Sequence, residues 1–272
     1  MSTAISRPSV EGVLAELAAR RRWRLPQIAL AAVLVAFLAW CAEGANLRPK
    51  AVIEAVPVIA EYFARMAPPK WEFAEVLWKP AAETLYIALW GNVIALLIGL
   101  PLGVLAASNV TRSPVLRHSA RAVLNLLRSI SELIWAVFFV AAVGLGPFAG
   151  VLAIALHATG MLAKFCAEEV EGVDKGPIEA IAATGGSRMQ VILFGIVPQV
   201  IPAFISYSIY RFDVSIRAAT ILGLVGAGGL GFSLIKTMKL FQYHETATCI
   251  LVIFVLVFVS DWICSRLRSR IL

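Results

Sequence analysis

Three glycines in the C-terminal third of the chain have the spacing of a phosphate-binding loop. Gly226, Gly228 and Gly231 spell GxGxxG after the apolar run ATILGLV, and Glu245 follows at the distance expected of a ribose-binding acid. That chemistry needs a strand before the glycines, a helix N-terminus facing the phosphates and a parallel sheet around them. Long apolar segments surround these glycines and no βαβ pattern is present, so we do not predict a nucleotide site.

The same stretch fits a break in a membrane-embedded helix. Five glycines lie between Gly223 and Gly231. Non-helical backbone at membrane depth is tolerated only where protein or a water-filled cavity covers it. We predict that Gly226, Gly228 and Gly229 form a hinge or a constriction in a pore. The alternative is a site where small residues let two helices cross closely.

Three charged residues, Arg211, Asp213 and Arg217, come shortly before the glycines. A charge in the hydrocarbon core costs about 2.5–3.5 kcal/mol on insertion scales, so such residues pair or face an aqueous cavity. We predict that Asp213 pairs with one arginine and leaves the other free to bind phosphate-like oxyanions through two parallel hydrogen bonds. The alternative is an anchor pair at the outer end of a span that contacts no solute.

The other reactive side chains predict no metal site and no nucleophile. The three histidines and four cysteines have no partner at metal-ligand spacing. His157 lies inside an apolar run, which favours a hydrogen bond between helices. Glu132 follows Arg128 by four residues, which favours a local ion pair.

The elements that carry these residues are apolar. Of the 272 residues, 60% are hydrophobic and 15% are charged, and the mean hydropathy is +0.84. Soluble domains are roughly 45–50% apolar and about 25% charged, so the excess indicates a lipid bilayer as solvent. The net charge of +7 comes from basic residues beside apolar runs, which indicates membrane topology rather than nucleic-acid binding.

We therefore predict an all-α polytopic membrane protein with about six transmembrane helices. In the second span, Gly99 and Gly103 form a GxxxG pattern that favours close helix packing. The spans are predicted at 27–43, 84–107, 126–145, 148–165, 191–210 and 246–264.

The distribution of basic residues predicts the orientation. Fifteen of the 24 Lys and Arg residues fall on the side that holds both termini, which we therefore place in the cytoplasm. The predicted parts are a cytoplasmic segment 1–26, a first span with an extracytoplasmic interfacial connection 27–82, a core 83–265 and a basic cytoplasmic tail 266–272. The connection contains the amphipathic stretch EAVPVIAEYFARM, which we expect to form an interfacial helix.

A cytoplasmic segment at 167–190 carries a helix, a sharp turn and a second helix. Gly176-Pro177 can start the first helix, and Gly185 or Gly186 can end it in a left-handed conformation. Ser187 and Gln190 have capping-box spacing. A short stiff helix with small alanine faces can enter a groove on a partner, and the alternative is an ordinary polar hairpin.

This segment resembles the EAA loop of bacterial binding-protein-dependent ABC importer permeases. The resemblance rests on Glu179-Ala180, on Gly185 six residues after the glutamate, and on Ile196 and Pro198. Two departures are mild: Ile181 replaces the third-position alanine, and the proline follows the isoleucine by two residues rather than three. In that family the loop binds the ATPase subunit. The resemblance therefore assigns Glu179, Ala180, Gly185, Gly186 and Pro198 to coupling.

The flanking segments resemble the phosphonate-type subgroup of these permeases. They are ALHATGMLAKFCAEEVEGVD before the loop and RFDVSIRAATILGLVGAGGLG after it, and the similarity covers about residues 80 to 265. The resemblance implies a homodimer in the bacterial inner membrane, two ATP-binding cassette subunits and an extracytoplasmic binding protein. It implies import of phosphonate or a related oxyanion by alternating access.

The chain has no GxxxxGK[ST], so ATP and Mg²⁺ are expected on the partner ATPase and no cofactor on this chain. Three alternatives remain. One is an importer permease for another small solute. A secondary transporter would show inverted repeats, and no repeat is visible. An intramembrane enzyme would need a paired nucleophile and base within the spans.

Overall fold

The computed structural model describes residues 27, 29–45, 47 and 49–270. The chain divides into two compact units, Met1–Ala64 and Arg65–Leu272, which are described separately. The predicted cytoplasmic segment 1–26 and the last two residues of the predicted tail lie outside the described residues.

The first unit contains an apolar helix, Ala29–Gly44, and most of helix α2, Pro49–Met66. The apolar helix coincides with the first predicted span but is shorter than the candidate spans of the second unit. Helix α2 contains the amphipathic stretch that we expected to be helical. Its location at a membrane interface stays a prediction.

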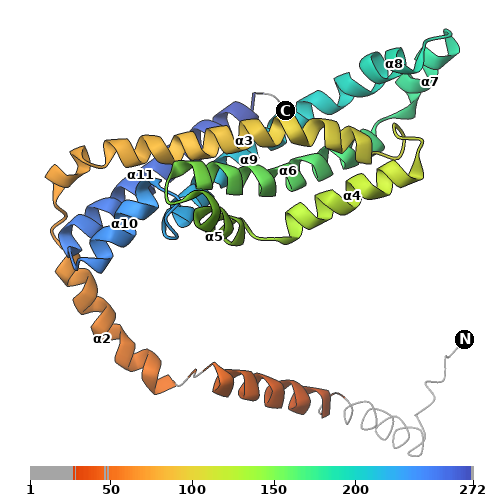
Figure 1. The fold of residues 1–272 in the computed structure, drawn as a ribbon. Coiled ribbons are helices and arrows are strands. Elements are labelled where there is room, and N and C mark those ends of the chain that lie inside the picture. Colours follow the sequence, from red (N-terminus) through yellow and green to blue (C-terminus); the bar gives the residue numbers. More distant parts are fainter. Residues whose placement is uncertain (1–26, 28, 46, 48, 271–272) are drawn as a thin grey trace, which may run out of the picture. The chain divides into compact units, whose positions relative to one another are not determined.

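The second unit is a bundle of helices (Figure 1). Its elements are η1 (Trp71–Glu75), α3 (Trp78–Ala106), α4 (Pro114–Ser129), α5 (Glu132–Val143), α6 (Pro147–Gly172), α7 (Lys175–Ala183), α8 (Arg188–Gln190), the π-helical turn η2 (Val191–Ile196), α9 (Val197–Gly223), α10 (Gly229–Lys239) and α11 (Tyr243–Arg268).

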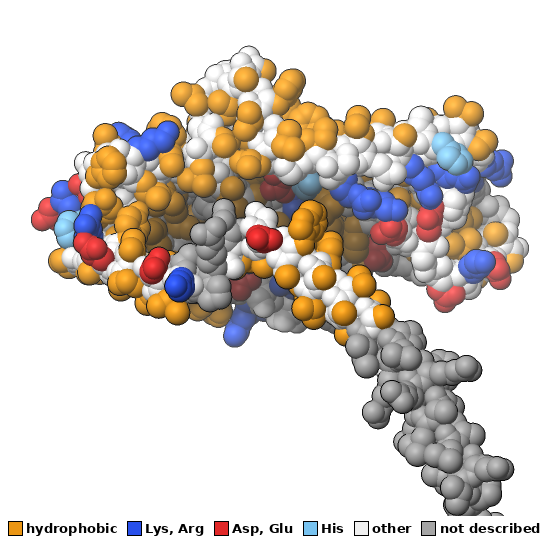
Figure 2. Space-filling view, turned by 90° about the horizontal axis from the view of Figure 1, so that it is seen from below, with side chains coloured by type: hydrophobic (Ala, Val, Ile, Leu, Met, Phe, Trp, Pro, Cys, Tyr) orange, Lys and Arg blue, Asp and Glu red, His pale blue; other side chains and the backbone are white. Residues whose placement is uncertain are grey.

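Four helical segments are long and apolar enough to cross a membrane, or five if α4 and α5 are counted as one broken span. In Figure 2, hydrophobic side chains cover much of the visible face, and charged side chains gather toward its two ends. The described residues contain helices and no strands, which confirms the all-α polytopic prediction. The four segments are Trp78–Ala106, Pro147–Gly172, Arg188–Gly223 and Tyr243–Arg268.

The third predicted span, 126–145, is not one helix. The chain bends by 86° between α4 and α5. Ile130 has an extended backbone, and the Ser131 hydroxyl caps α5 by accepting a hydrogen bond from the Ile134 amide at 3.4 Å. Hydropathy averages over Ser129 and Ser131, which flank Ile130 at this break, so the sequence indicated one continuous helix where the structure has a broken span.

The fifth span is longer than the predicted 191–210, because α8, η2 and α9 run together from Arg188 to Gly223. Ile216, Ala219 and Leu222 are buried in the second half of α9, so packing continues the helix past its charged residues. Arg211 and the two charged residues after it therefore lie inside this helix, not beyond its outer end.

Helix α6 lies at the centre of the unit and packs against α3, α4, α5 and α9. Its contact with α3 is close because glycines of α3 face it. A Cβ atom at Gly103 would lie 2.8 Å from the Ala163 carbonyl oxygen, and one at Gly99 would lie 3.5 Å from the Ala163 amide nitrogen. This confirms the close approach predicted from GxxxG.

Candidate functional site

The predicted helix–turn–helix segment is present, with one change at its start. Helix α7 begins at Lys175, two residues before Pro177, because the Asp174 side chain caps it by accepting from the Gly176 amide at 3.1 Å. Gly185 has φ +80°, the left-handed conformation that ends the helix at low cost in glycine. Ser187 and Gln190 form the predicted capping box at the start of α8.

Helix α7 has one packed face and one exposed face. Ile178 and Ile181 lie against η2, where a Cβ atom at Gly195 would lie 3.3 Å from the Ile181 side chain. Glu179 and Ala180 are exposed on α7. Ile181, the residue that departs from the family pattern, is thus one of the two isoleucines that hold α7 to η2.

Pro198 lies in the first turn of α9, directly after the π-helical η2. Proline cannot donate an amide hydrogen bond to the preceding turn, which fits a widened turn at this place. Gln199 beside it was missed by sequence reasoning. Its side chain accepts from the Asp174 amide at 3.0 Å and donates to the Gly195 carbonyl at 2.6 Å, so it ties the start of α7 to α9.

A buried polar cluster lies at the break between α4 and α5. Arg211 is 3% exposed, and its guanidinium donates to the Glu132 carboxylate. The Nε2 atom of His157 lies 3.6 Å from that carboxylate, and its Nδ1 atom lies 2.9 Å from the Ile130 carbonyl oxygen. The helix-to-helix hydrogen bond predicted for His157 is confirmed.

Two predictions about these charges were wrong. Glu132 pairs with Arg211 rather than with Arg128, because the break at 130–131 removes the i, i+4 geometry. Asp213 does pair with one arginine, Arg217. The other, Arg211, is not free, because Glu132 neutralises it.

A cavity of about 490 Å³ adjoins this cluster. The Arg217 side chain, which is 46% exposed, lines the cavity together with His157, Glu132 and Ser131. Two arginines and two carboxylates balance at this place, so the local charge is close to zero. Sequence reasoning considered only Asp213 and therefore expected an excess of positive charge.

The glycine segment forms the non-helical connection between α9 and α10. Gly226, Gly228 and Gly229 have φ of +95°, +81° and +72°, and all three are buried. The alternative of close packing holds as well, since a Cβ atom at Gly223 would lie 2.7 Å from the Gly231 Cα atom. Hinge motion or constriction at these glycines stays a prediction.

Two amide groups in the second half of the glycine segment are already satisfied by side chains of α3. The Gly229 amide donates to the Glu83 carboxylate at 3.1 Å, and the Leu230 amide donates to the Thr84 hydroxyl at 2.9 Å. A phosphate would need these donors. This capping therefore argues against the nucleotide-binding interpretation of GxGxxG. Among the described residues, no cluster of His, Cys, Asp and Glu could hold a metal ion.

A bundle of apolar helices with one broken span and an exposed helix between two spans is the architecture of a polytopic membrane protein. The family described as "Binding-protein-dependent transport system inner membrane component" matches residues 99–272, and the chain belongs to this family. It is a permease subunit of an ABC importer.

Two relatives within the family are named for the transport of phosphorus oxyanions. The chain is 39% identical to the phosphite transport system permease protein of Stutzerimonas stutzeri over 91% of this chain and 90% of that protein. It is also 39% identical to a phosphate-import permease of Mycolicibacterium smegmatis, over 92% of this chain and 47% of that protein.

Solved structures agree on the fold. The membrane subunit of a methionine ABC transporter in an inward-facing conformation superimposes with a TM-score of 0.61. The two chains are 23% identical, and the match covers 72% of this chain and 96% of the other.

Proposed function

We propose that this chain is the membrane subunit of a homodimeric importer that carries phosphite, phosphonate or a related phosphorus oxyanion across the bacterial inner membrane. The observation that supports this substrate class is the 39% identity, over nine-tenths of both chains, to a permease named for phosphite transport. Permeases named for carnitine and methionine match at only 24% and 27% identity, which favours other solutes less.

The assembly contains two ATP-binding cassette subunits, which bind ATP and Mg²⁺, and an extracytoplasmic binding protein that delivers the anion. Both termini and α7 face the cytoplasm. Support for this orientation comes from the basic residues on that side, including Arg266 and Arg268 in the last turn of α11.

Helix α7 is the contact for the ATPase. Its exposed face carries Glu179 and Ala180, and Gly185 and Gly186 form the turn that returns the chain to α8. Because Ile178 and Ile181 pack on η2, a displacement of α7 is passed to η2 and α9. Alternating access then follows from closure of the ATPase pair against two α7 helices.

The cavity beside Arg217 is the proposed part of the translocation path. Arg217 is 46% exposed while its partner Asp213 is 4% exposed, so the guanidinium can donate to an anion in the cavity and still hold the buried carboxylate. Arg211 has a different role, since it is buried and held by Glu132. The near-zero local charge favours passage over tight retention of the anion.

Reconstitution tests this function. The complete importer is reconstituted in proteoliposomes with its ATPase subunits and ATP on the inside and the binding protein on the outside. These proteoliposomes should take up radiolabelled phosphite. Unlabelled phosphonate or phosphate in excess should compete, and methionine or carnitine should not. Uptake that no phosphorus oxyanion reduces, or uptake without ATP, would contradict the proposal.

A further inference from the structure

The 107–113 loop, which joins α3 to α4, lies at the same end of the bundle as α7 (Figure 1). It is an ordered loop: the Thr111 amide donates to the Ala107 carbonyl at 3.0 Å, and the Thr111 side chain is buried. Beyond α3 and α4, its hydrogen bonds go to the last turn of α6, which precedes α7, and to the first residue of α8, which follows it.

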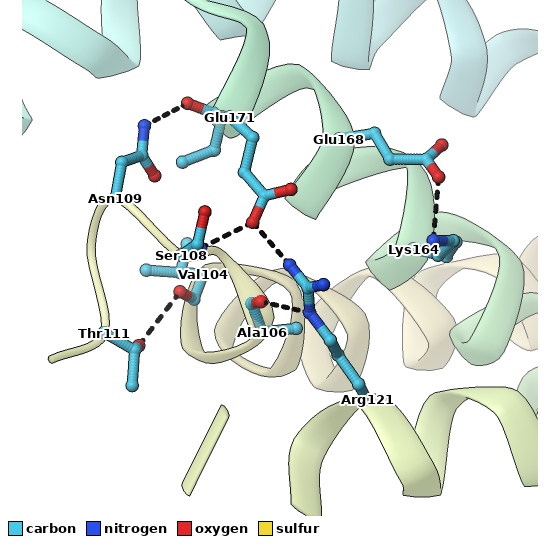
Figure 3. Close-up of polar contacts among 10 residues, drawn as sticks. Val104, Ala106, Ser108, Asn109, Thr111, Arg121, Lys164, Glu168 and Glu171 are labelled. Atoms are coloured by element: carbon cyan, nitrogen blue, oxygen red, sulfur yellow. Dashed lines mark hydrogen bonds and ion pairs between the residues drawn. The ribbon is translucent and has the colours of Figure 1, made fainter. Parts of the chain in front are cut away.

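The first set of contacts is to the last turn of α6, just before α7 (Figure 3). One oxygen of the Glu171 carboxylate accepts from the Ser108 amide at 2.6 Å and from the Arg121 guanidinium of α4 at 2.5 Å. The same guanidinium donates through Nε to the Ala106 carbonyl at 2.9 Å. The Asn109 side chain donates to the Val170 carbonyl at 2.5 Å.

The second contact is to the first residue of α8, just after α7. The Arg188 guanidinium donates to the carbonyl oxygen of Val110 in the middle of the loop. The loop therefore holds the chain at Glu171 on one side of α7 and at Arg188 on the other. Through Arg121, the same contacts include α4.

The position of Glu171 argues that these contacts do more than end a helix. A carboxylate in the last turn of a helix is disfavoured by the helix dipole. Glu171 in α6 is held there by donors from two other elements, Ser108 in the loop and Arg121 in α4. The nearby Lys164–Glu168 pair, at 2.8 Å, lies within α6 and joins no second element (Figure 3).

We propose that the 107–113 loop is a second coupling element, in which Arg121 and Glu171 pass the displacement of α7 to α4. This rests on the proposed role of α7 as the ATPase contact. By its own packing α7 acts on η2, and it is joined in the chain to α6, which packs against α4. The loop adds a direct polar link through which the same displacement reaches α4, whose other end is the break beside Glu132 and the cavity.

Arg121 and Glu171 are positioning residues, and a charge swap in the whole importer tests them. The variants are Arg121→Glu, Glu171→Arg, the double swap, and the milder Glu171→Gln and Arg121→Lys in case charge reversal prevents insertion. Glu168→Gln is the matched control, because it removes a carboxylate three residues away whose partner lies in the same helix. Three quantities are measured: ATPase subunits that co-purify, ATP hydrolysis stimulated by loaded binding protein, and uptake.

Each single variant should keep its ATPase subunits and its hydrolysis, while uptake per ATP falls by about fivefold or more, the scale of a coupling free energy between sites. The double swap should restore part of the lost uptake per ATP. Recovery should be incomplete, since a glutamate at position 121 cannot donate to the Ala106 carbonyl. Glu168→Gln should keep the wild-type ratio.

Three outcomes would overturn the coupling role. The first is a wild-type uptake per ATP in both Glu171→Gln and the charge reversals. The second is a well-inserted double swap whose uptake per ATP is no higher than that of either single variant. The third is loss of the ATPase subunits from the single variants. The last would mean that the loop only shapes the α7 surface. Failure of α7 itself is separate: Glu179→Lys would then keep both its ATPase subunits and its wild-type uptake per ATP, whatever the result at Glu171.

Discussion

Replacing Arg211 should destabilise the protein rather than block transport by the molecules that survive. Its side chain is buried and its guanidinium is bound to Glu132. Removing one partner of a buried ion pair leaves an uncompensated charge, which costs about 3–5 kcal/mol. That is a large part of a total stability of roughly 5–15 kcal/mol, so Arg211→Ala should sharply lower the yield of folded protein.

Arg217 on the same helix provides the comparison. The arginine is half exposed, but its partner Asp213 is 3% exposed, so Arg217→Ala also leaves a buried carboxylate without its partner and should cost about 1–3 kcal/mol of stability. Both variants are compared in detergent by thermal unfolding of purified permease, with uptake normalised to inserted protein. Replacing both members of the buried pair, as in Arg211→Met with Glu132→Leu, should recover stability relative to Arg211→Ala.

The reasoning would be refuted if Arg211→Ala melted like the wild type and lost its normalised uptake. That result would make Arg211 the anion-binding residue and the Glu132 contact incidental.

Four further outcomes are expected. Arg217→Ala should reduce normalised uptake at saturating binding protein, with only partial recovery in Arg217→Lys, because an ammonium lacks the planar fork; normal uptake in the alanine variant would remove it from the path. Glu179→Lys or Gly185→Val should lower co-purification of the ATPase or uncouple hydrolysis from uptake, with membrane insertion intact. Gly231→Ala should destabilise by about 3 kcal/mol, since its Cβ atom would lie 1.8 Å from the Thr220 carbonyl oxygen, whereas Gly172→Ala meets nothing within 4 Å and should melt normally. A reporter fused after residue 270 should be cytoplasmic and one within 50–70 extracytoplasmic; labelling of the C-terminus from outside would contradict the topology.

Local chemistry in the sequence predicted the α7 segment well. The capping box at Ser187 and the left-handed Gly185 depend on residues within a few positions of one another, so spacing alone identifies them. The start of α7 was misplaced because Asp174 competes with the proline as the start signal. Gln199, which fastens α7 from 25 residues away, has no local signature.

The charged cluster could not be predicted in the same way, because its pairing depends on the break between α4 and α5. A continuous helix would place Glu132 one turn from Arg128, which is the pair that sequence spacing favours. Because of the 86° bend, Glu132 lies instead against α9 and α6. Its carboxylate pairs with Arg211 of α9 and lies 3.6 Å from the Nε2 atom of His157 of α6. The bend thus decides which arginine pairs with Glu132.

The pairing of Glu132 with Arg211 gives the two arginines of α9 different surroundings. Arg217 and Arg211 lie on one helix, six residues apart, and composition gives no reason to separate them. Burial separates them: Arg211 fixes the N-terminus of α5 against α9, and Arg217 faces the cavity. If α4 moves with α7 through the 107–113 loop, the break moves with it, and Glu132 shifts relative to Arg211. ATP-driven motion at one end of the bundle would then alter the charge balance of the cavity directly, without requiring the glycine segment to move.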